Sequence, residues 1–274
     1  MRRSLLSLLS VAWLACVMSP ASVAAQSPWL VPRSDQAVHL EILKPSFDDG
    51  PDFTFTTLAL FLSGRLAVGE NVVLVAEVPF ANVGVGDGFE ESESAVGNIY
   101  LGAEFRGTDS PVFGEFGVRL PTTKDADYFD DLFMLMDVVD RWEAFLHEIV
   151  SLHAGFNYRY SGPTGLDVGF RIAPVLWIDV GDALVDPVEL FALYGAHVGY
   201  DAANLALRGG FSGRALITEG DADLGERTLH QFVLAASYGL GRWWPGVQIH
   251  LPLDDDLTEV LDLVFGLSLT VQLP

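Results

Sequence analysis

The sequence predicts an all-β fold, namely a transmembrane antiparallel up-and-down β-barrel of about twelve strands, within a range of about ten to fourteen. Three observations point to it. Apolar and polar residues alternate with a period of two over many segments, tight turns alternate with long connections, and no uninterrupted run of about 18 apolar residues follows residue 25. A membrane protein built of helices needs such runs, so the apolar residues of this chain are expected in strands.

The composition excludes two classes of protein. Of the 274 residues, 50% are hydrophobic, and 37 acids stand against 15 bases for a formal net charge of -22. Intrinsic disorder requires low hydrophobicity and is therefore excluded. Phosphate contacts require clustered lysines and arginines, so we expect no nucleic-acid partner.

Residues 1–25 are predicted to be a cleaved signal peptide. A basic start is followed by the apolar stretch 5–18 and by small residues at 23–25, which offer a cleavage point. We therefore expect export and localisation in the cell outer membrane of a Gram-negative bacterium. Residues 26–37 would then form an N-terminal periplasmic segment, and residues 38–274 the barrel.

The only cysteine, Cys16, lies within the expected signal peptide. Its removal excludes disulfides and thiolate chemistry from the mature chain. A lipid-modified Cys16 is the alternative, but Trp13 stands where a lipoprotein signal normally has leucine.

The final segment shows the strand pattern most clearly. All odd-numbered positions from 261 to 273 are apolar, whereas the even positions include Asp262, Gly266, Thr270 and Gln272. This is a strand with one oily and one wetter face. A first strand is expected at about 38–44, and the same period follows, in order, at 57–63, 72–80, 98–105, 115–120, 166–172 and 204–214.

The wetter face distinguishes a barrel from a soluble sandwich. It mixes Gly, Ser, Tyr, Gln and His with charges of both signs, which suits a crowded polar interior better than a surface facing bulk water. Tight turns are expected at 69–71, 107–111, 161–165, 201–203 and 239–241. They alternate with long connections at 45–52, 83–96, 122–143, 179–187, 218–226 and 253–259.

This alternation predicts short periplasmic turns, long extracellular loops, and both termini in the periplasm. The six long connections hold 25 of the 37 acids and only two bases, Lys124 and Arg141. The extracellular loops are therefore expected to be acidic.

Charged residues of the inward parity are the candidates to contact a solute in the lumen. One interpretation is that they pair across the lumen and leave little open pore, and the other is a polar constriction that selects solutes by charge and size. Both can hold together. The candidates are Glu77, Glu104, Glu115, Arg119, Asp167, Arg171, Glu189, Arg208 and Arg214.

Segment 128–139 differs from the other loops because its apolar residues follow helical spacing, which predicts a short amphipathic helix. Such a helix either packs across the barrel mouth as a cap or gates the lumen. The candidate gate residues are Phe129, Leu132, Phe133 and Met136.

No cofactor is expected beyond weak binding of Ca²⁺ or Mg²⁺ at acidic loops, with Asp254, Asp255 and Asp256 as the candidate metal ligands. Five histidines take the inward parity, and a lumen histidine is more often a hydrogen-bonded filler than a ligand. They are His39, His147, His153, His197 and His250.

No residue is assigned a catalytic role. Ser151 shares the inward parity with His147 and His153, but every second residue of a strand does so. An outer-membrane hydrolase therefore remains the weakest of the functional alternatives.

Three stretches resemble a known group of proteins: 72–80 (VVLVAEVPF), 97–105 (GNIYLGAEF) and 114–122 (GEFGVRLPT). With them, residues 72–122 are similar to a poorly characterised channel group that includes the phenol-degradation MetA-like proteins, and the whole mature chain resembles Gram-negative outer-membrane β-barrels. The chain ends in Gln272-Leu273-Pro274, whereas such barrels usually end in an aromatic residue.

The resemblance implies a porin-like barrel that passes or binds small solutes, including aromatic or apolar ones. It also implies three partners: membrane lipid with lipopolysaccharide, the barrel-assembly machinery, and a small-molecule solute. The function predicted from the sequence is thus an outer-membrane channel or small-solute transporter with a polar, mixed-charge lumen. The alternative is a structural or adhesive surface barrel with acidic loops.

Overall fold

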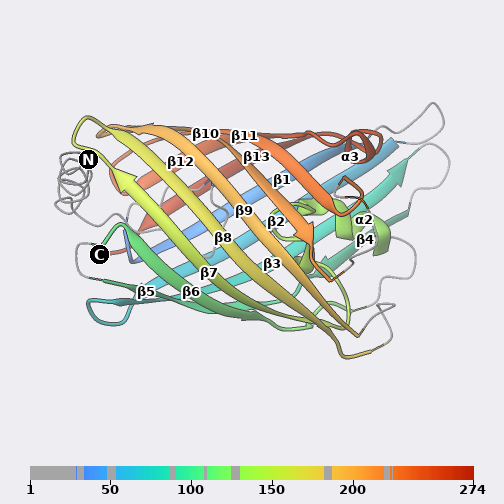
Figure 1. Ribbon diagram of the computed structural model, residues 1–274. Helices are drawn as coiled ribbons and strands as arrows, with labels where there is room; N and C mark the ends of the chain where they lie inside the picture. Colours follow the sequence, from blue (N-terminus) through green and yellow to red (C-terminus); the bar gives the residue numbers. More distant parts are fainter. Residues whose placement is uncertain are drawn as a thin grey trace, which may run out of the picture.

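The computed structural model of the protein describes residue 29 and residues 34–47, 54–86, 91–107, 110–124, 130–181, 187–218, 223 and 225–274. The chain forms one closed antiparallel barrel of long, strongly tilted strands (Figure 1). The strands are β1 (Ala37–Phe47), β2 (Thr54–Ala67), β3 (Val72–Gly86), β4 (Glu91–Val96), β5 (Tyr100–Arg106), β6 (Val112–Arg119), β7 (Ile149–Ser161), β8 (Leu166–Asp179), β9 (Val188–Asp201), β10 (Leu205–Leu216), β11 (Thr228–Tyr238), β12 (Trp243–Pro252) and β13 (Leu261–Gln272).

The ring closes because β1 pairs with both β13 and β2, while β2 also pairs with β3. The strands β4 and β5 pair with successive parts of β3 and together occupy one place in the wall. The barrel therefore has twelve strand positions, which confirms the predicted fold. Among the described residues, the strands other than β4 pair on both sides around the ring, as a wall in contact with lipid requires, whereas β4 pairs with β3 alone.

The two ends of the barrel differ. The C-terminus, the start of β1 and the described short turns lie at one end, called here the turn end, and the strand ends that lead into the long connections lie at the other, the loop end (Figure 1). Two short helices belong to the loop end, α2 (Asp130–Met134) and α3 (Asp255–Thr258). Among the described residues, no helix is both long enough and apolar enough to span a membrane.

Large apolar side chains are exposed on the outer face, as the alternation predicts. Leu62, Phe116, Phe156 and Leu234 are each exposed by 47% or more. An exposed apolar belt of this kind is stable where lipid surrounds the barrel.

Two sequence predictions are wrong in detail. Residues 83–86 and 91–96 do not belong to a loop, because β3 continues to Gly86 and β4 returns from Glu91 in register with it. The alternation of the last strand also fails at its start, where Leu261 is buried and Asp262 is exposed. Phe47 pairs with Leu261 while Ser46 pairs with Leu263, so a bulge at Asp262 shifts the face to which side chains point.

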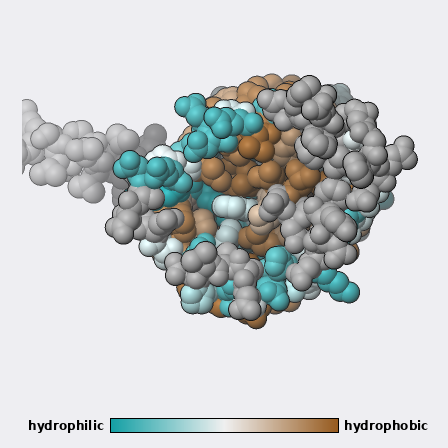
Figure 2. Space-filling model, turned by 90° about the vertical axis from the view of Figure 1, so that its right-hand side faces the viewer, coloured by the Kyte–Doolittle hydropathy of each residue, from teal (hydrophilic) through white to brown (hydrophobic). Residues whose placement is uncertain are grey.

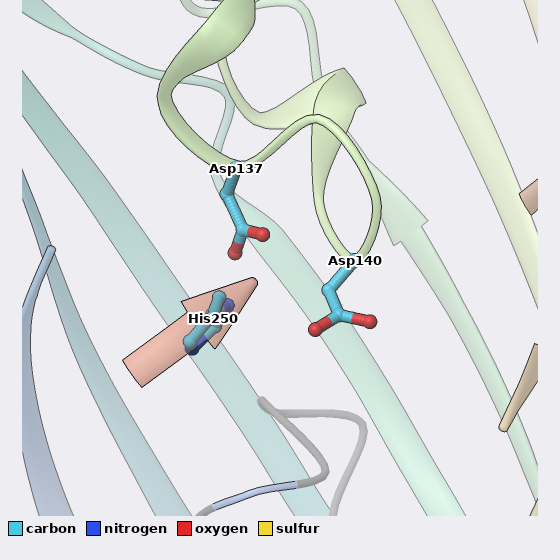
Figure 3. A group of neighbouring side chains, drawn as sticks. All are labelled: Asp137, Asp140 and His250. Carbon is cyan, nitrogen blue, oxygen red and sulfur yellow. The ribbon is translucent and has the colours of Figure 1, made fainter. Parts of the chain in front are cut away.

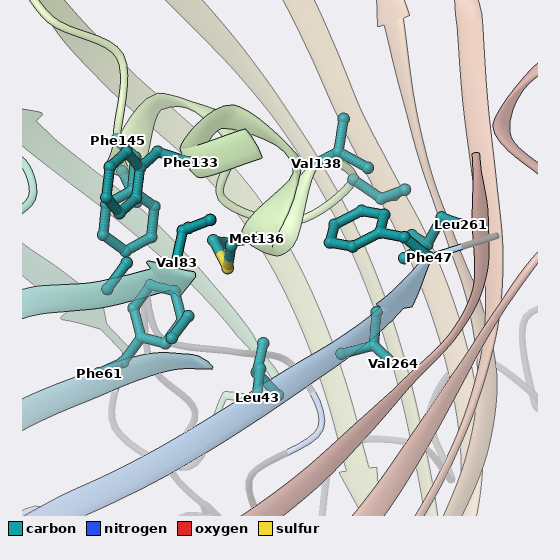
Figure 4. Close-up of a cluster of buried hydrophobic side chains, with 14 of the residues drawn as sticks. Leu43, Phe47, Phe61, Val83, Phe133, Met136, Val138, Phe145, Leu261 and Val264 are labelled. Carbon is teal, nitrogen blue, oxygen red and sulfur yellow. The ribbon is translucent and has the colours of Figure 1, made fainter. Parts of the chain in front are cut away.

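A long connection enters the barrel from the loop end. We call residues 130–148 the inserted loop; it contains α2 and two 3₁₀ turns, η1 (Leu135–Asp137) and η2 (Trp142–Ala144). Its Phe133, Met136 and Phe145 pack against Leu43 and Phe61 of the wall in one buried cluster (Figure 4). The apolar face predicted for this segment is therefore buried across the barrel mouth, as a cap would be.

The inserted loop is fastened where β4 gives way to β5. The side-chain amide of Asn98 donates to the carbonyls of Glu143 and Leu146, and its backbone N–H donates to that of Ala144. A Cβ at Gly97 would lie 2.3 Å from the Ala144 carbonyl oxygen. A glycine at this position is what allows the loop to approach the wall so closely.

We expect Gly97→Ala to lower the free energy of unfolding by about 1–3 kcal/mol, because the added methyl group has no room beside the loop backbone. The matched control is Gly64→Ala on β2, where a Cβ would have no heavy atom within 4 Å. The measurement is the urea midpoint of each purified barrel. Equal midpoints for the two variants would contradict the close approach.

Candidate functional site in the barrel lumen

The structure places the predicted lumen residues inside the barrel. Seven of them are 4% exposed or less: Glu77, Glu104, Glu115, Arg119, Asp167, Arg208 and Arg214. Arg171 and Glu189 are half-buried. Contact of these side chains with a solute stays a prediction.

One network of ion pairs lies near the turn end of the barrel. Arg65 of β2 holds Glu104 of β5 through two hydrogen bonds of 2.8 and 3.1 Å. Arg106 also donates to Glu104, and it reaches Asp35 at 2.6 Å. Arg65 was not among the predicted lumen residues, although it shares the inward parity of Ser63 and extending the alternation by two residues would have found it.

A second network joins four strands. Asp167 of β8 pairs with Arg208 of β10 at 2.9 Å, with Arg159 of β7 at 2.9 Å, and with His197 of β9 at 3.1 Å. Nearby, Arg171 pairs with Glu115 at 2.8 Å. These charges have partners one or two strands away across the lumen, as buried charges must have.

The third network ties the inserted loop to the wall. Arg141 lies 2.6 Å from Glu41, 3.3 Å from Glu77 and 2.5 Å from Asp137 of its own loop. Arg119 supplies a second cation to Glu77 at 2.8 Å. Arg141 was also missed as a lumen residue, because a loop base has no strand parity to follow. Glu41 was missed although it shares the inward parity of His39 on β1, and extending the alternation would have found it.

Glu143 of the inserted loop lies close to His153 and Ser151, the residues considered for a hydrolase. It pairs with Arg214 at 2.7 Å and lies 3.3 Å from His153 Nε2, which in turn lies 3.0 Å from Ser151 Oγ. Burial is the largest single influence on the pKa of Glu143 and would raise it, but Arg214, Arg119 and the other neighbouring groups together outweigh it and lower that pKa to about 2.

This trio does not have the geometry of a catalytic triad. The serine hydroxyl and the carboxylate both approach the same ring nitrogen of His153. A triad needs them on opposite nitrogens, so that the carboxylate orients the ring while the other nitrogen takes the serine proton. The arrangement is better described as a buried hydrogen-bonded cluster.

An aromatic cleft opens at the loop end between the inserted loop and strands β7 to β11. Trp142 lies 5.4 Å from Trp177 and 6.2 Å from Phe191, and the latter two rings are 4.2 Å apart, measured between ring centres. The guanidinium of Arg214 lies over the three rings at 5.4 to 5.9 Å. The cleft holds about 1060 Å³ of space, part of it open to solvent, and Glu189 also lines it.

The view onto the loop end shows apolar surface in a recess, with polar residues along parts of its rim (Figure 2). A further cavity lies in the lumen below, where Trp29 and Asp140 line its wall together with Phe113 and Arg171. Trp29 is 2% exposed and is the one described residue of segment 26–33.

The predicted gate residues and metal ligands differ in burial. Of the predicted gate residues, Phe133 and Met136 are buried and Leu132 is half-buried, whereas Phe129 lies outside the described residues. Asp254 pairs with His230 at 2.8 Å, while Asp255 and Asp256 are exposed on α3. Cation binding at these acids stays a prediction.

Solved structures share this architecture at low sequence identity. An outer membrane channel from Pseudomonas putida F1 has a TM-score of 0.62 at 14% identity, over 92% of this chain and 100% of that one. The β domain of the Bordetella autotransporter BrkA has a TM-score of 0.50 at 10% identity, over 88% and 100%. The translocator domain of the autotransporter NalP from Neisseria meningitidis has a TM-score of 0.50 at 15% identity, over 88% and 89%.

These similarities are of fold, and they confirm the predicted outer-membrane barrel architecture. No family model matches the chain. No curated protein matches it either.

Proposed function

We propose that the chain is an outer-membrane channel or transporter for a small solute, exported with a cleaved signal peptide. Its lumen is polar and of mixed charge, and its loop end faces the outside of the cell. The partners proposed with this function are lipid and lipopolysaccharide around the apolar outer face, the barrel-assembly machinery, and the solute itself, with no nucleic acid among them.

The observation that carries the proposal is the aromatic cleft at the loop end. Trp142, Trp177 and Phe191 line a concave space, and the guanidinium of Arg214, which is paired with Glu143, lies over their rings. Concave apolar sites with a few placed polar groups are the usual form of small-molecule sites. The cleft therefore suits a small solute with an aromatic or apolar body, and an anionic substituent would lie near Arg214.

Passage requires the inserted loop to move. The buried cluster of Phe133, Met136 and Phe145 packs the loop against the inner wall near the barrel mouth. Within the proposed function the loop is thus both cap and gate, and the polar networks beneath it form the constriction that a solute meets next.

Two other functions are less well supported. A hydrolase needs the serine and the carboxylate on opposite nitrogens of the histidine, and Ser151 and Glu143 share one. A structural or adhesive barrel with acidic loops needs no aromatic cleft. Solute flux separates the channel from the adhesive barrel, because only the channel conducts.

The test is uptake of a small aromatic acid by liposomes that contain the purified barrel. We expect saturable uptake by the wild-type protein, and in Trp177→Ala a half-saturation concentration raised about two- to tenfold, because a ring pair contributes about 0.5–1.5 kcal/mol. The matched control is Trp244→Ala, which removes an inward tryptophan that does not line the cleft.

Two outcomes would overturn the proposal. Absence of flux through the folded wild-type barrel would leave the structural interpretation. An equal rise of the half-saturation concentration in Trp177→Ala and Trp244→Ala would show that the cleft has no special part in passage.

A further inference from the structure

We propose that Asp137, Asp140 and His250 form a binding site for a divalent transition-metal ion, with Zn²⁺ as the representative, which links the inserted loop to β12. Each residue offers one ligand atom, and these three atoms all lie within 4.8 Å of one another. Figure 3 shows the two carboxylates projecting from the loop toward the histidine on the strand. This site is independent of the proposed transport function.

The histidine supplies the first argument. His250 is 1% exposed, and its Nε2 has no hydrogen-bond partner among the described residues. A buried polar nitrogen without a partner is costly, so such an atom requires an explanation. A metal ion held between this ring and the two carboxylates would provide one.

The second argument is the balance of charge around the site. Arg141 is shared by Glu41, Glu77 and Asp137, and Arg119 assists only with Glu77. Asp140, in contrast, accepts from neutral donors, the indole of Trp29 and the amide of Gln231, each at 2.8 Å.

The group as a whole therefore contains four carboxylates and two guanidinium groups. With all four carboxylates ionised, this group carries an excess of two negative charges in the barrel interior. A buried charge is retained when it is paired or coordinates a metal, and one divalent cation would balance this excess.

The donor set indicates which cation. One imidazole nitrogen with two carboxylates is a set that Zn²⁺ and its first-row neighbours accept, whereas Ca²⁺ takes six to eight oxygens and Mg²⁺ an octahedron of them. Asp140 also lines the lumen cavity, which leaves room for a water ligand. The site is distinct from the acids at 254–256 on the rim.

The chain offers a close control. His39 is also inward-facing and 1% exposed, and its Nε2 likewise lacks a partner among the described residues, but it belongs to no such cluster of metal-ligating groups there. A partnerless nitrogen alone therefore predicts the same behaviour for both histidines. The proposal predicts that replacing His250, but not His39, lowers the affinity for Zn²⁺.

The experiment titrates Zn²⁺ into the folded full-length barrel in detergent, after stripping with a chelator, in competition with a chromophoric chelator. Excess Mg²⁺ is present throughout to occupy the acidic rim. We expect one Zn²⁺ per barrel for the wild type and for His39→Gln, and an affinity at least about tenfold lower for His250→Gln and Asp140→Asn.

Asp140→Asn protects the test against misfolding, because an amide oxygen can still accept from Trp29 and Gln231. Zn²⁺ should also raise the unfolding midpoint of the wild type and His39→Gln, since a ligand that binds only the folded state stabilises it. The midpoints of His250→Gln and Asp140→Asn should not respond. Absence of stoichiometric Zn²⁺ uptake by the wild type, or equal uptake by His250→Gln and His39→Gln, would overturn the proposal.

Discussion

Replacing Arg141 by methionine is expected to lower the free energy of unfolding by about 3–5 kcal/mol. The guanidinium lies within 3.3 Å of Glu41, Glu77 and Asp137, all of them 5% exposed or less. Without it these carboxylates remain buried with Arg119 as the one nearby cation for Glu77, and they must either take up protons or open the barrel mouth to water. Urea unfolding, followed by the shift in gel mobility between folded and unfolded barrel, measures the loss.

The control for Arg141→Met is Lys124→Met. Lys124 is the other base of the long connections, and its side chain is exposed. Its removal should change stability by less than about 0.5 kcal/mol. If the two variants unfold at the same urea concentration, Arg141 does not hold the inserted loop to the wall.

The second large effect is expected on the outer face. Leu267 lies at the centre of β13, is 46% exposed, and is paired with Ile42 on one side and Val247 on the other. In a bilayer this position is near the midplane, so Leu267→Arg should cost about 2–4 kcal/mol and reduce the yield of folded barrel in membranes.

The same substitution at Leu263 tests whether the cost of an arginine depends on its depth in the bilayer. Leu263 lies on the same face of the same strand, toward the loop end, and is 36% exposed. There the arginine can reach the interface, and the cost should fall to about 0–1 kcal/mol. Equal folded yields of Leu263→Arg and Leu267→Arg would mean that this face does not meet lipid at the depth assigned.

The alternation of residues determined most of the fold. A strand that separates lipid from a lumen must place apolar residues at every second position, and this requirement is local enough to be read without knowing any neighbour. It identified the closed barrel and the burial of Glu77, Glu104 and Asp167. It failed where the period breaks, as at the bulge beside Asp262.

The inserted loop was predictable in character but not in position. Helical spacing of Phe133 and Met136 indicated an apolar face that needed cover, and the barrel mouth provides it. Nothing in that spacing indicates that Asn98 fastens the loop, because the contact depends on where β4 and β5 meet.

By itself the sequence determined the closed antiparallel barrel and the inward face of most of its strands. Only the tertiary structure decided which charges pair. Arg65 meets Glu104, Arg141 meets Glu41, and Asp140 lies beside His250 although 110 residues separate them in the chain. The physical reason is that parity is a property of one strand, whereas pairing across a lumen depends on the tilt and stagger of all the strands and on the path of a loop inside them.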